Sequence, residues 1–303
     1  MTFTQTIKSE VLRVRGDKKC CRRSLLYGLL LFSTRFEEEK IQFTSESAET
    51  TDKVYKLLKE FYPDCKTEQY TVSAGERTEY RIMISDKDST NVIFNDLKYA
   101  DGITYKILLE NFMCDSCKAA FIRGAFLSCA SAIPPESGYH LEFVVSRFNL
   151  SRELLRILKI CGYNAKYTKR NSHYIIYFKD SQAIVDIIAF IGAVNCSFEM
   201  TNLIIEKDIR NNCNRVVNCE AANIKRTVSS AQKHIEAIKG LVDEDKFSLL
   251  NAELQETANI RLENDDVSLG ELALLHSPPV TKSCVNHRLK KICDMWKKYK
   301  SNK

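Results

Sequence analysis

Apolar and polar positions along this chain form one long pattern that occurs twice. Residues 21–31 are mostly apolar and carry one glycine, Gly28, and residues 117–127 repeat this arrangement 96 positions later around Gly124. Both segments read as apolar helices. A glycine inside a helix costs about 1 kcal/mol relative to alanine, so its presence at the same place in both copies predicts two helices that pack closely and cross at Gly28 and Gly124.

The repeat continues beyond the glycine helices. Amphipathic helices are predicted at 54–59 and 154–159, and strands at 41–44, 140–145, 80–86 and 174–180. Asp86 and Asp180 close the later strand of each copy and are suited to starting a helix. Each half therefore reads α, β, α, β, β, α. A period of almost 100 residues is too long for a solenoid unit, so we expect a pseudo-two-fold α+β domain over 1–201, with halves at about 1–100 and 114–201.

The rest of the chain reads as helical. We expect a helical linker over 202–245, in which Asn211, Asn214, Asn218 and Lys225 share one helix face. Two interpretations stay open for this face: a solvated connector, or a surface that contacts phosphates.

Residues 246–303 predict an all-α domain with a helix–turn–helix. A helix is predicted at 249–262, and Ser268 is placed to cap a short helix over 269–275. Two prolines at 278–279 end that helix. A second helix over 281–295 has Val285, Leu289 and Ile292 at core-facing spacing. Two short helices joined by a tight turn indicate a helix–turn–helix, although many such pairs are only core hairpins.

Charge supports a nucleic-acid interpretation of this segment. The chain has a net charge of +6, and residues 282–303 hold eight lysines and arginines against one acid, so the other 281 residues are nearly neutral. Such a basic end is typical of nucleic-acid binding, less often of an anionic membrane; a solvated lysine tail is the alternative. Asparagine can pair with adenine and lysine or arginine with guanine, while serine and basic side chains hold phosphates. The candidate DNA-binding residues are Lys282, Ser283, Asn286, His287, Arg288, Lys290 and Lys291.

Composition excludes several classes of protein. With 44% hydrophobic and 28% charged residues the chain reads as an ordinary globular protein. No secretory signal is evident, and the longest apolar run, 25–32, is too short to cross a membrane. We therefore expect a cytoplasmic protein without a membrane partner or a small-molecule substrate.

The twelve cysteines lie mainly in apolar stretches, as reduced thiols do in cytosolic chains. Cys114 and Cys117 form a single C-x-x-C, and the adjacent Cys20 and Cys21 are their one plausible partner pair. A zinc site usually needs two well-spaced pairs or added histidines. The sequence alone therefore predicts no metal and no cofactor.

Three segments together resemble the WhiA family, the sporulation and cell-division regulators of Gram-positive bacteria. They are the doubled Cys-Lys/Arg-x-x-x-x-x-Gly helix, the stretch 214–223 and the ending 283–291, in the family's order along the chain. The resemblance implies an N-terminal domain of the LAGLIDADG homing-endonuclease type and a C-terminal helix–turn–helix similar to sigma-factor region 4. It also implies a DNA-binding regulator of transcription or a chromosome-associated cell-division factor, which binds double-stranded DNA at the nucleoid; a protein co-regulator is left open.

Homing endonucleases of this type place an acid five residues after each helix glycine. The two carboxylates hold divalent metal for phosphodiester hydrolysis. Here these positions carry Ser33 and Cys129, neither of which is negatively charged at neutral pH. We therefore expect no catalytic residues and no enzyme activity.

Two other functions stay open at this point. One is a metal-dependent endonuclease with a reorganised acidic site at 37–39, and the other is a scaffold whose repeat domain binds a protein. Around the second hairpin, Lys166, Lys169, Arg170 and His173 could contact phosphates or could simply be solvated.

Overall fold

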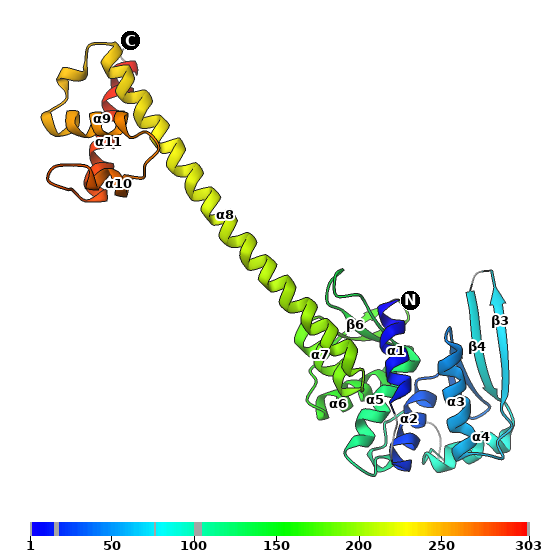
Figure 1. Ribbon diagram of the computed structural model, residues 1–303. Coiled ribbons are helices and arrows are strands. Elements are labelled where there is room, and N and C mark those ends of the chain that lie inside the picture. Colours follow the sequence, from blue (N-terminus) through cyan, green and yellow to red (C-terminus); the bar gives the residue numbers. More distant parts are fainter. Residues whose placement is uncertain (1, 15–17, 76, 100–104, 302–303) are drawn as a thin grey trace. The chain divides into compact units, whose positions relative to one another are not determined.

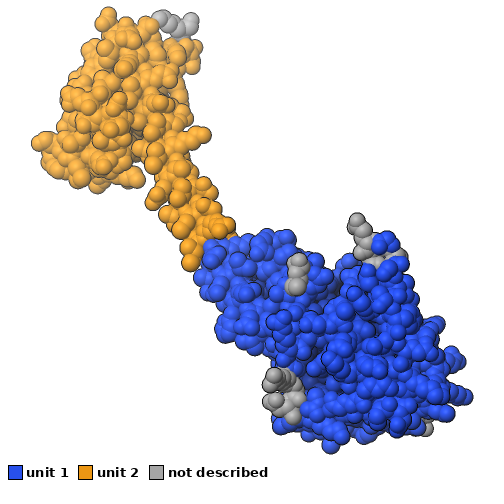
Figure 2. All heavy atoms as spheres, turned by 45° about the vertical axis from the view of Figure 1, so that its right-hand side comes forward, with its two compact units in different colours: residues 1–207 blue, residues 208–303 orange. Residues whose placement is uncertain are grey.

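The chain divides into two compact units, residues 1–207 and 208–303 (Figure 2). The computed structural model describes residues 2–14, 18–75, 77–99 and 105–301. Among the helices in these ranges, none combines the length and apolar character needed to cross a bilayer.

The first unit contains two halves with the same order of elements (Figure 1). The first half consists of α2 (Lys19–Leu31), β1 (Arg35–Glu37), β2 (Lys40–Ser45), α3 (Ala48–Phe61), β3 (Glu68–Ala74), β4 (Arg77–Ile84) and α4 (Lys87–Asp96). The second half consists of α5 (Ser116–Cys129), β5 (Ala130–Ala132), β6 (Leu141–Val145), α6 (Phe148–Ile160), β7 (Lys166–Arg170), β8 (His173–Phe178) and α7 (Ser181–Phe190). Helix α1 (Phe3–Arg13) precedes the first half, and the 3-10 helix η1 (Leu109–Asn111) lies between the halves.

Each half builds its own antiparallel sheet. Within the described residues the strands form two four-stranded sheets, in the orders β1-β2-β4-β3 and β5-β6-β8-β7. Even the register is shared, because Phe43 pairs with Ile82 in one sheet and Phe143 with Ile176 in the other. The predicted repeat and fold class are confirmed, with one addition to each half: β1 and β5, three residues each, are too short to show an alternating pattern.

The same local signals start and orient the helices in both halves. Asp86 and Asp180 cap α4 and α7 by accepting hydrogen bonds from backbone N–H groups three residues later, at 3.1 and 2.9 Å. Helix α3 buries Val54, Leu57 and Leu58, and α6 buries its equivalent residues at the same spacing. The apolar face of each helix thus covers its half of the core.

The two halves meet where α2 and α5 cross. A methyl group built on Gly28 would lie 2.2 Å from the carbonyl oxygen of Phe121, and one built on Gly124 would lie 2.4 Å from that of Leu25. Real Cβ contacts are never this short, so each glycine lets the backbone of the opposite helix approach. The predicted close crossing of the glycine helices is confirmed.

The second unit is helical and has a separate core. It contains the C-terminal part of α8 (Val194–Asp243), the 3-10 helix η2 (Phe247–Leu249), α9 (Ala252–Glu263), α10 (Leu269–Leu274) and α11 (Lys282–Ser301). Helix α8 begins eight residues before the expected linker of 202–245 and ends two residues before the end of that linker. Its residues Ile238 and Leu241 are buried among apolar side chains of α9, α10 and α11, so the end of the expected linker is part of this core.

We predict that Gly28→Ala destabilises the folded chain by about 2–3 kcal/mol, since the added methyl forces α2 and α5 apart. Urea unfolding followed by circular dichroism measures this change. Gly270→Ala is the matched control, because its added methyl has no neighbour closer than 3.7 Å. This variant should stay within about 1 kcal/mol of the parent, on the stabilising side. Equal losses in the two variants would contradict the close crossing.

Candidate nucleic-acid interface

Helices α10 and α11 form the predicted helix–turn–helix. Ser268 caps α10 in a capping box: its hydroxyl accepts from the backbone N–H of Glu271, while its own N–H donates to the Glu271 carboxylate at 2.8 Å. The backbone N–H of Val280 donates to the carbonyl of Ala273 at 3.0 Å and closes the connection. Helix α11 begins at Lys282, one residue after the predicted start, and runs to Ser301 rather than 295.

The inner face of α11 is fixed by apolar packing. Val285, Leu289 and Ile292 are fully buried, as their spacing predicts. Six of the seven candidate residues lie on the solvent side and are exposed: Lys282, Ser283, Asn286, His287, Lys290 and Lys291. They form two rows at four-residue spacing, 282–286–290 and 283–287–291. The structure therefore brings these six side chains to one accessible helix surface.

Arg288 is the exception among the candidates. Its side chain is 14% exposed and forms ion pairs with Glu253 at 3.2 Å and Glu256 at 3.8 Å. It also donates to the hydroxyl of Thr257 at 3.4 Å. All three partners belong to α9, so Arg288 holds α11 against α9 and is not free to contact DNA in this arrangement.

A cavity of about 380 Å³ lies between α8 and α11 within the second unit, and Asn286 and Lys290 line it. Lysines predominate over acids in its charged lining: Lys233, Lys290, Lys297 and Lys300 against Glu236 and Asp294. Two residues of the 282–286–290 row, Asn286 and Lys290, therefore line a cavity with more lysines than acids.

The C-terminal half of α11 packs on α8. The Trp296 ring lies against Gly240, where an added methyl would be 2.3 Å from Cζ2. Lys300 lies over the same ring at 5.5 Å and faces Glu236 at 3.9 Å. Through Ser301, therefore, the basic end of the chain is an ordered helix and not a solvated tail; Lys303 lies outside the described residues.

Ser33 and Cys129 lie at the C-terminal ends of the crossed helices. The Ser33 hydroxyl donates to the carbonyl of Arg35 at 2.8 Å, and the Cys129 thiol donates to that of Ala125 at 3.3 Å. Both line a cavity of about 320 Å³. The lining residues are Phe32, Ser33, Thr34, Phe43, Thr44, Ser128, Cys129, Val144, Ser146 and His173, and none of these is an acid.

The electrostatics at this position disfavour a divalent cation. Burial raises the pKa of the Cys129 thiol to about 12, so it is neutral at physiological pH. Lys8 from α1 lies close enough to interact with Cys129 and with the carboxylate of Glu46, and burial lowers the pKa of its amine. Hard divalent cations need charged oxygen ligands, whereas this end of the helix pair offers a neutral thiol, a hydroxyl and a basic amine.

The acidic segment 37–39 does not replace the missing carboxylates. Glu37 pairs with Arg147 at 3.2 Å and with Arg35 at 3.5 Å. In the part of the chain that the structure describes, one group of three or more potential metal ligands lies close together, and it consists of cysteines. Glu37 is therefore engaged with two arginines and, among the described residues, 37–39 do not belong to a group of three or more potential metal ligands.

Two further sets of polar side chains were singled out from the sequence. At the second hairpin, Arg170 pairs with Glu142 at 3.1 Å and Lys169 lies over the Tyr174 ring at 5.6 Å, while Lys166 is exposed. The polar string on α8 is exposed throughout, at Asn211, Asn214, Asn218 and Lys225. Both interpretations of each set stay open.

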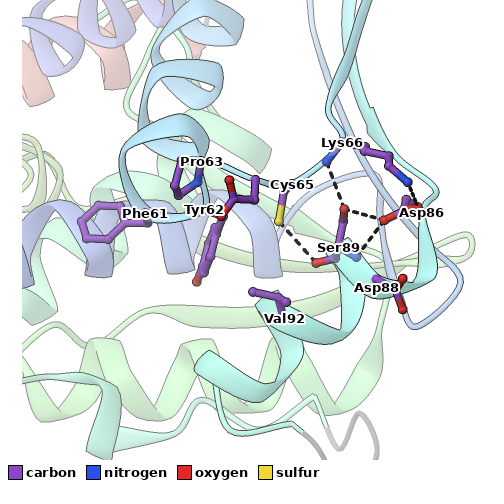
Figure 3. A pocket seen from close by; sticks show the side chains of 10 residues that line it. Phe61, Tyr62, Pro63, Cys65, Lys66, Asp86, Asp88, Ser89 and Val92 are labelled. Carbon is purple, nitrogen blue, oxygen red and sulfur yellow. Dashed lines mark hydrogen bonds and ion pairs between the residues drawn. The ribbon is translucent and has the colours of Figure 1, made fainter.

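A cavity of about 440 Å³ beside α4 is lined by groups that satisfy one another (Figure 3). Lys66 pairs with Asp86 at 2.8 Å, and the other Asp86 oxygen accepts from the Ser89 hydroxyl at 2.7 Å. The hydrogen bond from Lys66 holds the pKa of Asp86 at about 2. Because this carboxylate already serves as a helix cap and an ion-pair partner, the cavity is not a candidate site.

Comparison with known proteins agrees with the two units. A model of the WhiA C-terminal HTH domain matches residues 213–296, and a model of the WhiA LAGLIDADG-like domain matches residues 118–210. The probable cell division protein WhiA of Alkaliphilus metalliredigens is 32% identical over 305 residues, covering 96% of each chain. Its counterpart from Clostridium botulinum strain Hall is 35% identical over 307 residues, again covering 96% of each.

The chain belongs to the WhiA family. The crystal structure of full-length DUF199/WhiA from Thermatoga maritima matches with a TM-score of 0.60 and 23% identity, covering 98% of this chain and 99% of that one. At 23% identity this match supports the fold alone. The WhiA LAGLIDADG-like model covers the second half of the repeat, and the first half has the same sheet order.

The residues beneath α11 predict a pH dependence for the second unit. His234 on α8 is buried, and its pKa is lowered to about 4, by burial first and then by the positive charge of Arg261. The unfolded chain binds a proton below the ordinary value of 6.5, whereas the folded chain stays neutral down to about pH 4. The free energy of unfolding is therefore unaffected by His234 above pH 6.5. It falls as the pH falls from 6.5 to about 4, because only the unfolded chain binds the proton there.

We expect His234→Gln to reduce the pH slope of the unfolding free energy between pH 6.5 and 4 by up to about 1.4 kcal/mol per pH unit. Trp296 is the single tryptophan of the chain, so its fluorescence follows this unit during denaturant unfolding. The parent chain, measured over the same pH range, is the reference. If the parent and the variant have the same slope, His234 does not titrate as described.

Proposed function

We propose that this protein is a non-enzymatic DNA-binding regulator that acts in cell division. The observation that carries the proposal is the outer surface of α11, where six polar and basic side chains are exposed on a helix whose opposite face is anchored in the core. The matched HTH domain and the cell-division names of the relatives support it. Regulation of transcription, including in sporulation, at the nucleoid in the cytoplasm is part of the same proposal.

The surface suits duplex DNA for electrostatic and geometric reasons. A recognition helix presents its N-terminal residues to base edges in the major groove, and Ser283, Asn286 and His287 lie in the first two turns of α11. Lys282, Lys290 and Lys291 flank them and can neutralise phosphates, which supplies most of the affinity and makes it depend on salt. Asn286 can read adenine by a bidentate hydrogen bond.

The lack of enzymatic activity rests on the helix ends in the first unit. There Ser33 and Cys129 occupy the positions of the metal-binding acids, the cavity lining has no carboxylate, and Lys8 adds a basic group. The close crossing of α2 and α5, which brings these two helix ends together, is present in this chain.

Charge reversal on α11 should weaken binding to every DNA sequence. Lys282→Glu and Lys290→Glu are each expected to lower the affinity and to reduce the slope of log K against log salt by about 1. Asn286→Ala should instead flatten the preference for a target sequence, by about 1–3 kcal/mol at one base pair. Fluorescence anisotropy of labelled duplexes with the full chain, over a series of salt concentrations, measures all three effects.

Lys87→Glu provides the matched control. It makes the same charge change at an exposed position in the first unit, on the first residue of α4, where an acid suits the helix dipole. Its DNA affinity should equal that of the parent. If Lys87→Glu weakens binding as much as Lys290→Glu, binding follows net charge alone and the α11 interface is wrong.

Nuclease activity has its own test. Supercoiled plasmid incubated with the protein and Mg²⁺ or Mn²⁺ should stay intact, while an active homing endonuclease in the same buffer cuts its own target plasmid. Metal-dependent nicking that disappears in Glu37→Gln would contradict the assignment and support a site at 37–39.

A further inference from the structure

Four cysteine thiols, two from each half of the first unit, gather at the N-terminal ends of the crossed helices. Cys20 and Cys21 lie in the first turn of α2, Cys114 lies two residues before α5, and Cys117 lies in the first turn of α5. The Cys114 sulfur is 3.7 Å from that of Cys20, 3.6 Å from that of Cys21 and 3.5 Å from that of Cys117. All four sulfurs lie within 4.8 Å of one another.

These separations match a single tetrahedral metal ion. Zinc binds thiolate sulfur at about 2.3 Å, so the corners of a regular ZnS₄ tetrahedron are about 3.8 Å apart. The three contacts to Cys114 fall within 0.3 Å of that edge. Disulfide sulfurs are about 2.0 Å apart, and all four cysteines are free.

Burial raises the pKa of the Cys20 thiol and raises that of Cys21 to about 12 in the metal-free chain, but the helix ends beside the cluster favour the ionised form that a metal would bind. Cys20, Cys21 and Cys117 occupy the first turns of two helices, where free N–H groups and the helix dipole stabilise negative charge. The largely buried Arg123 lies close enough to Cys21 for a thiolate there to stabilise the positive charge of its guanidinium. Four thiolates around Zn²⁺ leave two negative charges, and these groups offset them.

The geometry also limits the kind of metal centre. Four sulfurs within 4.8 Å of one another enclose room for one ion and not for a cluster of several irons. Tetrahedral sulfur ligation is the geometry that zinc prefers, and four protein ligands leave no open position for a substrate. Cys117 is fully buried and Cys21 is 8% exposed, as in a structural site.

We propose that Cys20, Cys21, Cys114 and Cys117 bind one structural zinc ion that joins the two halves at the N-terminal ends of α2 and α5. The site is separate from the serine and cysteine at the opposite helix ends and from the α11 surface. It replaces the expectation of no metal drawn from the sequence, where two pairs more than 90 residues apart gave no ligand spacing to recognise.

The test begins with the metal content of the full-length chain, purified under reducing conditions without chelator and measured by inductively coupled plasma mass spectrometry. We expect one zinc per chain. Cys117→Ser and Cys114→Ser should lose it, whereas Cys65→Ser, which changes a buried cysteine outside the cluster, should keep it. Removal of zinc by a chelator should lower the melting temperature of the parent and of Cys65→Ser.

A cobalt titration makes the test independent of variant folding. Co²⁺ added to the metal-free parent should produce sulfur-to-cobalt charge transfer and the intense visible bands of tetrahedral thiolate ligation, saturate at one equivalent, and be displaced by Zn²⁺. Absence of both zinc and this cobalt spectrum in the parent would overturn the proposal. So would loss of metal in Cys65→Ser to the same extent as in Cys117→Ser, or recovery of the four cysteines as disulfides under reducing conditions.

Discussion

The first unit depends on one backbone contact, the crossing of α2 and α5 at Gly28 and Gly124. Each half contributes a sheet and helices that cover part of it, and the two halves share a single core because these helices can touch. Aromatic side chains fill the space beside the crossing: the rings of Tyr27 and Phe121 lie 5.0 Å apart, and Phe112 lies 5.3 Å from Phe121. With larger residues at the two glycine positions, α2 and α5 would lie further apart and these rings would lose their contacts.

The same crossing brings together two pairs of helix ends with different chemistry. At the C-terminal ends lie Ser33 and Cys129, in a cavity whose lining holds no carboxylate, and the amine of Lys8 lies close to Cys129 and to Glu46. At the N-terminal ends lie four thiols at metal-binding distances. Helix dipoles favour cations at the first pair of ends and thiolates at the second. The two pairs of ends therefore differ in the chemistry of their side chains, although one helix crossing positions both.

Local patterns were sufficient to predict much of this architecture. The doubled glycine helices, the capping aspartates and the buried row Val285, Leu289 and Ile292 follow from periodicity and spacing within a few turns, and the structure confirms them. Strands β1 and β5 were not predicted because three residues hold too little alternation. Helix α1, capped by Thr2, was missed although its capping box is present in the sequence.

Features that depend on distant partners could not be predicted in this way. Arg288 belongs by sequence to the basic face of α11, and only the position of Glu253 and Glu256 on α9 shows that it is engaged within the protein. Both cysteine pairs are visible in the sequence. That they lie together in space depends on the helix crossing, which brings the first turns of α2 and α5 close to each other.

The glycine crossing also makes the two halves of the repeat depend on each other. Each glycine accommodates the backbone of the helix from the opposite half. A larger residue at either position would therefore push α2 and α5 apart. The two halves differ in length away from this crossing. The hairpin strands have seven and eight residues in the first half, and five and six in the second. The backbone approach at the crossing thus constrains Gly28 and Gly124 together, whereas the lengths of the hairpins are free to differ between the halves.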